Sequence, residues 1–199
     1  MAQVHRAGLQ GQEGARDERD EDEEGLVRAA QHDRAAFGPL YARYRDRLYT
    51  YLRTRTGTAD DAADLTQQVF MQALEALPRY RSQGVSLAAW LFRIARNAAT
   101  DWQRRQRPTV PWDAVPEAFH PSAPETADGA LLQREAFAPL YALLATLDAP
   151  TREALILRFT AQLTVAEIGA VLGKSEEAAR KQITRALHTL KEQYHDDTP

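Results

Sequence analysis

Cysteine is absent from this 199-residue chain, and only three of its 25 basic residues are lysines. Without thiols, the chain cannot form disulfides, a thiolate nucleophile or cysteine-ligated zinc and iron–sulfur centres. Long apolar runs are missing too: the mean hydropathy is -0.52, and no stretch of about eighteen apolar residues is available to span a bilayer. The sequence therefore predicts no membrane insertion. Residues 1–19 also contain no apolar core like that of a signal peptide, which favours a cytoplasmic protein.

Catalytic and metal-binding patterns are missing as well. The five histidines are scattered, no nucleophile has a partnered base, and no glycine-rich phosphate loop occurs. Asp60, Asp61 and Asp64 lie close together, but no histidine or further acid lies at ligand spacing. Because carboxylates stabilise the first turn of a helix, helix capping explains the three aspartates better than a metal site does. We therefore expect a protein that is not an enzyme and that uses no cofactor or metal.

The net charge of -3 would argue against a nucleic-acid-binding protein, because such domains are usually basic. The average hides an uneven distribution: residues 1–25 have a net charge of -5, whereas residues 26–108 have a net charge of +7. Residues 79–107 hold seven arginines and a single acid. Guanidinium groups neutralise phosphates, and a ring such as Tyr80 can stack on an unpaired base. This segment predicts a nucleic-acid-binding face in preference to an ordinary solvated helix surface.

Composition divides the chain into four parts. Residues 1–24 are rich in acids and poor in apolar residues, which is typical of a disordered arm. Residues 108–130 hold five of the ten prolines, which block regular helix and indicate a linker. Residues 25–107 and 131–195 show apolar residues at helical spacing without strand-like alternation. We therefore expect an all-α protein in which a flexible linker joins two small helical domains.

Helix start signals recur in the first of these domains. Asp33 can cap a helix that Gly38 and Pro39 can kink or restart. A short helix is expected before it, over residues 26–31, and further helices are expected over residues 60–77 and after a Ser86 cap. The helix after Ser86 is the one whose polar face carries the arginines, so the sequence places the basic surface on a regular element.

The second domain shows the pattern of a helix-turn-helix. Residues 131–147 show apolar residues at helical spacing, and Thr151 can cap the helix that follows a break at residues 148–150. Thr164 and Glu167 form a capping box for a short helix, Gly173 can end that helix in a left-handed conformation, and Ser175 can cap the last one. The second helix of such a pair enters a DNA groove. The residues expected to turn inward on it are Ala179, Ile183, Leu187 and Leu190.

The order of these parts, together with two strings, resembles the sigma-70 family of bacterial transcription initiation factors. The strings are DLTQQVF at residues 64–70 and WLFRIARNAATD at residues 90–101. The small two-domain extracytoplasmic-function (ECF) branch is the closest in organisation, and the likeness covers about residues 24–195. It implies two helical domains that lie on RNA polymerase core enzyme, with the linker between them.

The resemblance also implies a role for each surface. In the family, the helix that corresponds to residues 61–77 binds the clamp helices of the largest polymerase subunit. The matching residues are Asp61, Asp64, Gln67, Gln68, Phe70, Met71 and Glu75. The following loop and helix melt and capture the minus-ten promoter element, with an extruded base held in a loop pocket. The matching residues are Arg79, Tyr80, Arg81, Trp90, Arg93, Arg96, Asn97, Thr100, Arg104 and Arg105.

In the second domain, the resemblance places the last helix in the major groove of the minus-thirty-five element. The matching residues are Ser175, Glu176, Glu177, Arg180, Lys181, Thr184, Arg185 and His188. Family members are often held inactive by an anti-sigma factor, which implies a third partner beside core polymerase and promoter DNA. A stand-alone helix-turn-helix regulator acting through residues 131–199 is the alternative, although neither family string is needed for such a role.

Overall fold

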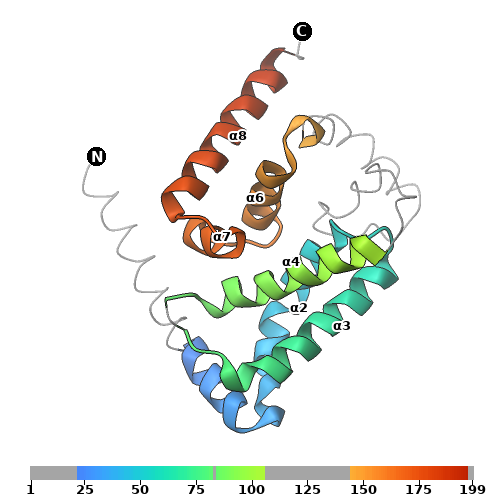
Figure 1. Cartoon of the computed structure of the whole chain (residues 1–199), viewed down its shortest axis with the longest axis vertical. Helices are drawn as coiled ribbons and strands as arrows, with labels where there is room; N and C mark the ends of the chain where they lie inside the picture. The colour runs from blue at the N-terminus through green and yellow to red at the C-terminus, as the bar shows by residue number, and fades with distance from the viewer. Residues whose placement is uncertain (1–21, 83, 106–143, 197–199) are drawn as a thin grey trace.

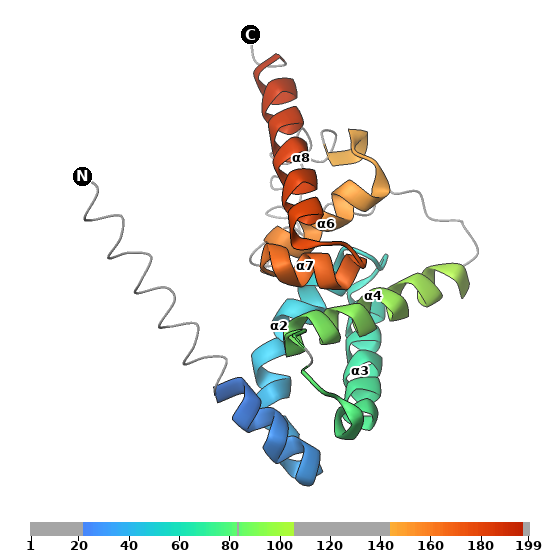
Figure 2. The same ribbon diagram turned by 60° about the vertical axis from the view of Figure 1, so that its left-hand side comes forward.

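The computed structural model describes residues 22–82, 84–105 and 144–196, and within these ranges its regular structure is entirely helical. The all-α prediction is confirmed. Figures 1 and 2 show an N-terminal unit of blue to green helices and a C-terminal unit of orange to red helices, in contact through α4 and α7. No helix in the described ranges is long and apolar enough to cross a membrane. The predictions for residues 1–21, for the proline-rich residues 108–130 and for most of the helical segment 131–147 lie outside the described residues.

The N-terminal unit spans residues 22–105. It contains a helix over residues 22–32, the 3₁₀ turns η1 (Arg34–Phe37) and η2 (Leu77–Arg79), and the helices α2 (Gly38–Arg53), α3 (Ala59–Ala76) and α4 (Leu87–Arg105).

Side-chain caps explain where these helices begin. The Asp33 carboxylate accepts from the backbone N–H of Ala35 at 2.9 Å, and this capped turn ends where Pro39 opens α2. A proline in a first turn loses no hydrogen bond, so the helix restarts there as expected. The hydroxyl of Ser86 accepts from the backbone of Ala89 at 3.2 Å, which confirms the predicted cap of α4.

The first helix begins before the expected boundary of the acidic arm. Residues 22–24, which the composition predicts to be part of that arm, are helical, and the helix continues through Gly25. Asp22 forms an ion pair with Arg43 of α2 at 3.3 Å, and the Tyr44 hydroxyl donates to Glu23. Because these two carboxylates have partners on α2, the last acids of the run belong to the folded unit.

The core of the N-terminal unit is formed where α2, α3 and α4 pack against one another. Leu48, Leu52, Val69 and Phe92 have no exposed surface. The rings of Tyr51 and Phe92 meet edge to face, with centroids 5.5 Å apart. Full burial of each such side chain contributes about 1.5–3 kcal/mol, so this apolar contact holds α4 in place and aims its polar face outward.

The C-terminal unit spans residues 144–196 and contains the helices α6 (Ala149–Phe159), α7 (Val165–Leu172) and α8 (Glu176–Asp196). The cap of α6 differs from the expectation. Asp148, not Thr151, is the N-cap, and its carboxylate accepts from the Thr151 backbone at 3.2 Å. Pro150, which we expected to separate two helical segments, lies inside the first turn of α6. The backbone N–H groups of a first turn have no partner within the helix, so a proline there costs no hydrogen bond.

The helix-turn-helix geometry follows the sequence closely. The hydroxyl of Thr164 accepts from the backbone of Glu167 at 3.2 Å, and the Glu167 carboxylate accepts from the backbone of Thr164 at 2.7 Å, which completes the capping box. Gly173 ends α7 with φ 68°, the left-handed conformation that glycine adopts without strain. Ser175 caps α8 by accepting from the Ala178 backbone at 3.2 Å.

One inward position on α8 was predicted wrongly. Leu187 is 42% exposed, whereas Ala186 is 3% exposed and takes the inner position beside Ala179 and Ile183. A helix turns by about 100° per residue, so position 186 lies nearer to the direction of positions 179 and 183 than position 187 does. The spacing alone allowed either residue, and the larger apolar one was the wrong choice.

Gly169 lies where α7 and the start of α8 approach each other closely. A Cβ atom added there would lie 2.8 Å from the backbone oxygen of Lys174. We expect Gly169→Ala to destabilise the chain by about 1–2 kcal/mol, because the steric cost exceeds the gain in helix propensity. Urea unfolding followed by circular dichroism measures this. Gly38→Ala is the control, since a Cβ there meets nothing within 4 Å; equal unfolding midpoints for the two variants would contradict the prediction.

Candidate functional site

The basic surface predicted on the helix after Ser86 lies along α4. Its members are polar residues of the helix that are not among those packed into the core. We call this set the α4 face: Arg93, Arg96, Asn97, Thr100, Arg104 and Arg105. All of these residues except Arg96 are exposed. Arg104 lies 3.7 Å from Asp101 and Arg96 lies 4.0 Å from Glu153, whereas the exposed Arg93 and Arg105 give the face a positive charge.

The loop before α4 is held by a small aromatic and polar network. The rings of Tyr80 and Trp90 lie 4.9 Å apart, and the Tyr80 hydroxyl donates to the backbone oxygen of Val85 at 2.9 Å. Burial raises the pKa of Tyr80, so this hydroxyl remains a donor at neutral pH. The side-chain amide of Gln31 donates to the backbone oxygens of Leu77 and Tyr80 at 3.0 and 2.9 Å. The first helix thereby fixes the loop from the other side.

A cavity of about 460 Å³ lies between the first helix and this loop. Its lining includes Glu23, Glu24, Gln31, Tyr80, Arg81 and Ser82. Cavities of about 300–1,000 Å³ are typical of small-ligand sites, so an unstacked base fits in this volume. The cavity combines an aromatic ring, an exposed guanidinium, two carboxylates and polar side chains near the start of α4.

Most of the residues matched to the polymerase surface share the outer side of α3. We call this set the α3 face: Asp64, Gln67, Gln68, Met71 and Glu75, all of them exposed. Met71 is 58% exposed, an unusual state for a large apolar side chain. Asp61 is half-buried and is engaged in the helix cap, where it accepts from the Thr58 hydroxyl at 2.7 Å.

Phe70 was expected on that surface but lies in the core, with 5% of its surface exposed. Its ring packs against Phe37 and Tyr41, with centroid distances of 6.1 and 4.6 Å. The reason is helical geometry: Phe70 lies one turn after the buried Thr66 and beside the buried Val69, so it points toward α2. Met71, the next residue along, takes the outward direction.

The recognition surface predicted on the last helix lies along α8. We call this set the α8 face: Arg180, Lys181, Thr184, Arg185 and His188, all of them exposed. Glu176 forms an ion pair with Arg180, and Glu177 forms one with Lys181 at 2.6 Å. Both pairs span one helical turn, so the two glutamates orient and partly neutralise the bases that follow them. Ser175 serves as the helix cap.

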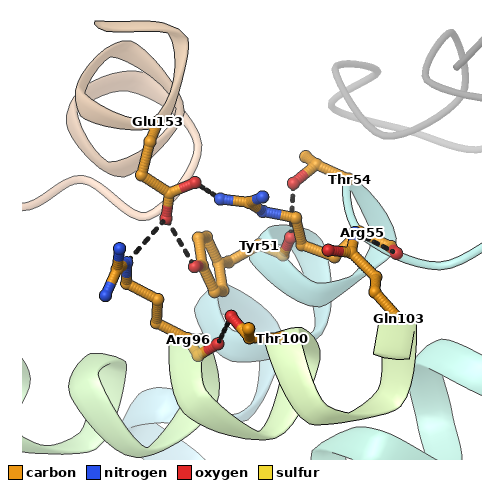
Figure 3. A network of polar contacts seen from close by, with 7 residues as sticks. All are labelled: Tyr51, Thr54, Arg55, Arg96, Thr100, Gln103 and Glu153. Atoms are coloured by element: carbon orange, nitrogen blue, oxygen red, sulfur yellow. Dashed lines mark hydrogen bonds and ion pairs between the residues drawn. The ribbon is translucent and has the colours of Figure 1, made fainter. Parts of the chain in front are cut away.

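Sequence reasoning did not identify Glu153, the polar residue at the contact between the two units. Glu153 is 5% exposed, and its side chain lies among groups from α2 and α4 (Figure 3). The signal in the sequence was an acid next to the apolar run from Ala154 to Leu157, all of which is buried. Charged side chains are rarely buried without a partner, so such a position implies one elsewhere in the fold.

Both units match known protein families. Residues 40–109 match the family described as Sigma-70 region 2, and residues 143–192 match Sigma-70, region 4. The ECF RNA polymerase sigma factor BldN of Streptomyces coelicolor is 33% identical over 173 residues, which cover 86% of this chain and 66% of BldN. The ECF RNA polymerase sigma factor SigD of Mycobacterium tuberculosis is 31% identical over 175 residues, with 84% of this chain and 81% of SigD covered.

Solved structures agree with these matches. CnrH in complex with the cytosolic domain of CnrY has 28% identity and a TM-score of 0.63, with 87% of this chain and 97% of CnrH covered. RpoE of Bartonella quintana in complex with the anti-sigma factor NepR has a TM-score of 0.56 at 22% identity, over 81% and 98% of the two chains, which supports the fold alone. On its two region matches and these relatives, the chain belongs to the sigma-70 family, in the branch of ECF RNA polymerase sigma factors.

Proposed function

We propose that this chain is a transcription initiation factor that binds RNA polymerase core through the α3 face and promoter DNA through the α4 and α8 faces. The α4 face beside the aromatic cavity is the observation that carries the proposal. Few roles other than nucleic-acid binding call for that many guanidinium groups and a base-sized cavity on one small helical unit. The factor itself performs no catalysis, since the polymerase supplies the chemistry.

The minus-ten element is assigned to the N-terminal unit. Strand separation requires that phosphates be neutralised while an unpaired base is stacked or enclosed. The arginines of the α4 face and of the preceding loop supply the first requirement. The Tyr80–Trp90 pair and the cavity beside it supply the second. Because the Gln31 amide holds this loop by two hydrogen bonds, the pocket is preorganised before DNA arrives.

The minus-thirty-five element is assigned to the C-terminal unit. Its helix-turn-helix exposes the α8 face, and arginine and lysine side chains at that position can reach base edges and phosphates in a major groove. The pairing of Glu176 and Glu177 with Arg180 and Lys181 lowers the net charge of the helix start. We propose that this part of the interface contributes more to the choice of promoter sequence than to electrostatic affinity.

An anti-sigma factor is a further proposed partner. RpoE was solved with the anti-sigma factor NepR, and CnrH was solved with the cytosolic domain of CnrY. In this chain, a groove of about 830 Å³ is lined by both units. The lining includes Arg43, Arg47, Val85, Arg158, Glu167 and Arg180. A protein segment that binds there would contact both units at once. Since RNA polymerase lies in the cell interior, the proposal also places the factor in the cytoplasm.

Run-off transcription with purified core polymerase tests the proposed function. We expect specific transcripts from promoters that the cell activates on overexpression of this chain, and none with core enzyme alone. The isolated residues 131–199 added to the same reaction are the matched control, because they contain the helix-turn-helix without the α3 and α4 faces. Repression, or no effect of the whole chain on initiation, would instead support the stand-alone helix-turn-helix regulator.

A further inference from the structure

The first helix, over residues 22–32, is fastened at both ends and lies beside the segment that leads into α4 (Figure 1). At its start, Asp22 forms an ion pair with Arg43 of α2 at 3.3 Å. In its second half, Ala30 is packed into the core with 3% of its surface exposed. At its end, the side-chain amide of Gln31 donates to the loop before α4. The helix is therefore a fixed support from which Gln31 reaches the loop.

Gln31 donates twice to backbone oxygens of that loop. Its Nε2 lies 3.0 Å from the oxygen of Leu77 and 2.9 Å from the oxygen of Tyr80, so the two bonds join both ends of the turn η2. Backbone carbonyls beyond the last turn of a helix are free to accept from side chains. Arg81 also donates to the Tyr80 oxygen, at 2.8 Å, but Arg81 belongs to the loop itself. Gln31 therefore ties the loop to a separate element.

The residue that Gln31 holds also carries the ring beside the cavity. Tyr80 and Gln31 both line the cavity of about 460 Å³, and the Tyr80 ring lies 4.9 Å from that of Trp90. The Tyr80 hydroxyl donates to the oxygen of Val85 at 2.9 Å, so the far end of the side chain is fixed within the loop. The backbone of the same residue is fixed by Gln31. The Gln31 amide therefore sets where the ring lies relative to the cavity.

We infer that Gln31 is a positioning residue for the capture of the unpaired minus-ten base, which makes the first helix part of the promoter-opening machinery. The inference rests on the proposed function, because it concerns the cavity assigned to that base. Gln31 acts through Tyr80 and the loop, which it keeps in the form that accepts a base. When a smaller fraction of molecules has that form, the apparent Kd rises in proportion. The residues that match Sigma-70 region 2 begin at position 40, so this role falls outside the matched stretch.

The chemistry of the two bonds restricts which side chain can fill this role. Both targets are carbonyl oxygens, so the group at position 31 must donate twice, as a glutamine amide does. Methionine is of similar length and volume but donates nothing, and a glutamate carboxylate would face two acceptors. A side chain that only filled space would tolerate methionine, since exchanges that conserve volume cost little. We therefore expect base capture to fall in the order wild type, Gln31→Met, Gln31→Glu.

Tryptophan fluorescence of the free protein tests whether Gln31 holds the loop. The chain has three tryptophans, so Trp102→Phe together with Trp112→Phe leaves Trp90 as the single reporter beside Tyr80. In that background, Gln31→Met should shift the emission maximum to longer wavelength, because a released loop admits water to the ring. An emission maximum that stays at the wild-type position overturns the positioning role.

Gln193→Met is the matched control, because it makes the same change at another half-buried glutamine. Gln193 lies on α8 but outside the α8 face, and its side chain accepts from the Thr146 hydroxyl at 3.3 Å. The control should keep the wild-type emission maximum. Far-ultraviolet circular dichroism establishes that each variant keeps its helices. Gln31→Glu is the second variant, and a smaller effect than that of Gln31→Met would contradict the hydrogen-bond account.

Holoenzyme binding separates base capture from the other contacts. The template is a fork from a promoter that the cell activates on overexpression, with the minus-thirty-five element double-stranded and the minus-ten element single-stranded. Gln31→Met should raise the Kd for this fork by about 5-fold or more, as expected for the loss of two neutral hydrogen bonds. The Kd for core polymerase, and for a duplex with the minus-thirty-five element alone, should stay within about twofold of wild type, because sites without shared partners act independently.

The three binding measurements together decide the inference. An unchanged Kd for the fork, or an equal loss in all three measurements, overturns the role of Gln31 in base capture. Wild-type holoenzyme that binds neither template would instead reject the proposed function. The fluorescence measurement uses no DNA, so it would still decide whether Gln31 positions the loop.

Discussion

Replacing five exposed arginines of the α4 face and of the loop before it by alanine is expected to reduce the salt dependence of promoter binding by the holoenzyme. If these arginines contact five phosphates, they should add roughly -4 to -5 to the slope of the logarithm of the wild-type binding constant against the logarithm of the salt concentration. That slope corresponds to a loss of affinity of about 250- to 1,000-fold between 50 and 200 mM salt. The residues to replace are Arg79, Arg81, Arg93, Arg104 and Arg105.

Filter binding or fluorescence anisotropy over a salt series measures the slope for both holoenzymes. Arg45→Ala is the control, since Arg45 is an exposed arginine of α2 that pairs with the adjacent Asp46 at 2.9 Å and lies outside the α4 face. We expect the control to keep the wild-type slope, because counterion release depends only on charges that meet phosphates. A wild-type slope in the five-arginine variant would show that these arginines do not bind phosphates.

Met71→Glu is expected to weaken binding to core polymerase by about 100-fold or more. Met71 is 58% exposed on an otherwise polar face, which is the position of an apolar anchor in an interface. A carboxylate there would be taken out of water without a partner when the polymerase covers it, and this carries a large desolvation cost. Anisotropy of the dye-labelled factor titrated with core enzyme gives the Kd.

Gln72→Glu is the matched control for that variant. It makes the same change in charge at the next residue of α3, which is exposed but lies about 100° around the helix from Met71. We expect the control to bind core polymerase within about threefold of wild type, as exposed charges at the rim of an interface contribute little. Equal weakening by both substitutions would show that the effect is one of charge and not of the α3 face.

Much of this fold follows from hydrogen bonds between residues that are close together in the sequence. The capping box of Thr164 and Glu167, the left-handed Gly173 and the Ser86 cap all depend on atoms within a few residues, and the structure places them as expected. The basic segment likewise follows from composition alone. Residues 79–107 hold seven arginines and a single acid, so the segment presents guanidinium groups however it folds. The all-α fold class and the segment that carries the basic face are therefore determined by the sequence itself.

Packing decided the residues whose direction periodicity leaves open. Phe70 and Met71 are neighbours in a string that indicated the family, yet one is 5% exposed and the other 58%. Which of the two points inward depends on where α2 lies, and α2 is about 20 residues away along the chain. The same holds for Ala186 and Leu187 on α8, since the inner side of that helix is defined by α6 and α7.

The contact between the units depended entirely on tertiary structure. Glu153 meets Tyr51 and Arg55 across about 100 residues, and no local pattern pairs an acid of one helix with donors that distant. The sequence determined that the chain has two helical units, a basic surface and a helix-turn-helix, because these follow from local hydrogen bonding and charge. Only the tertiary structure decided which carboxylate is buried between the units, because burial depends on the surfaces that meet.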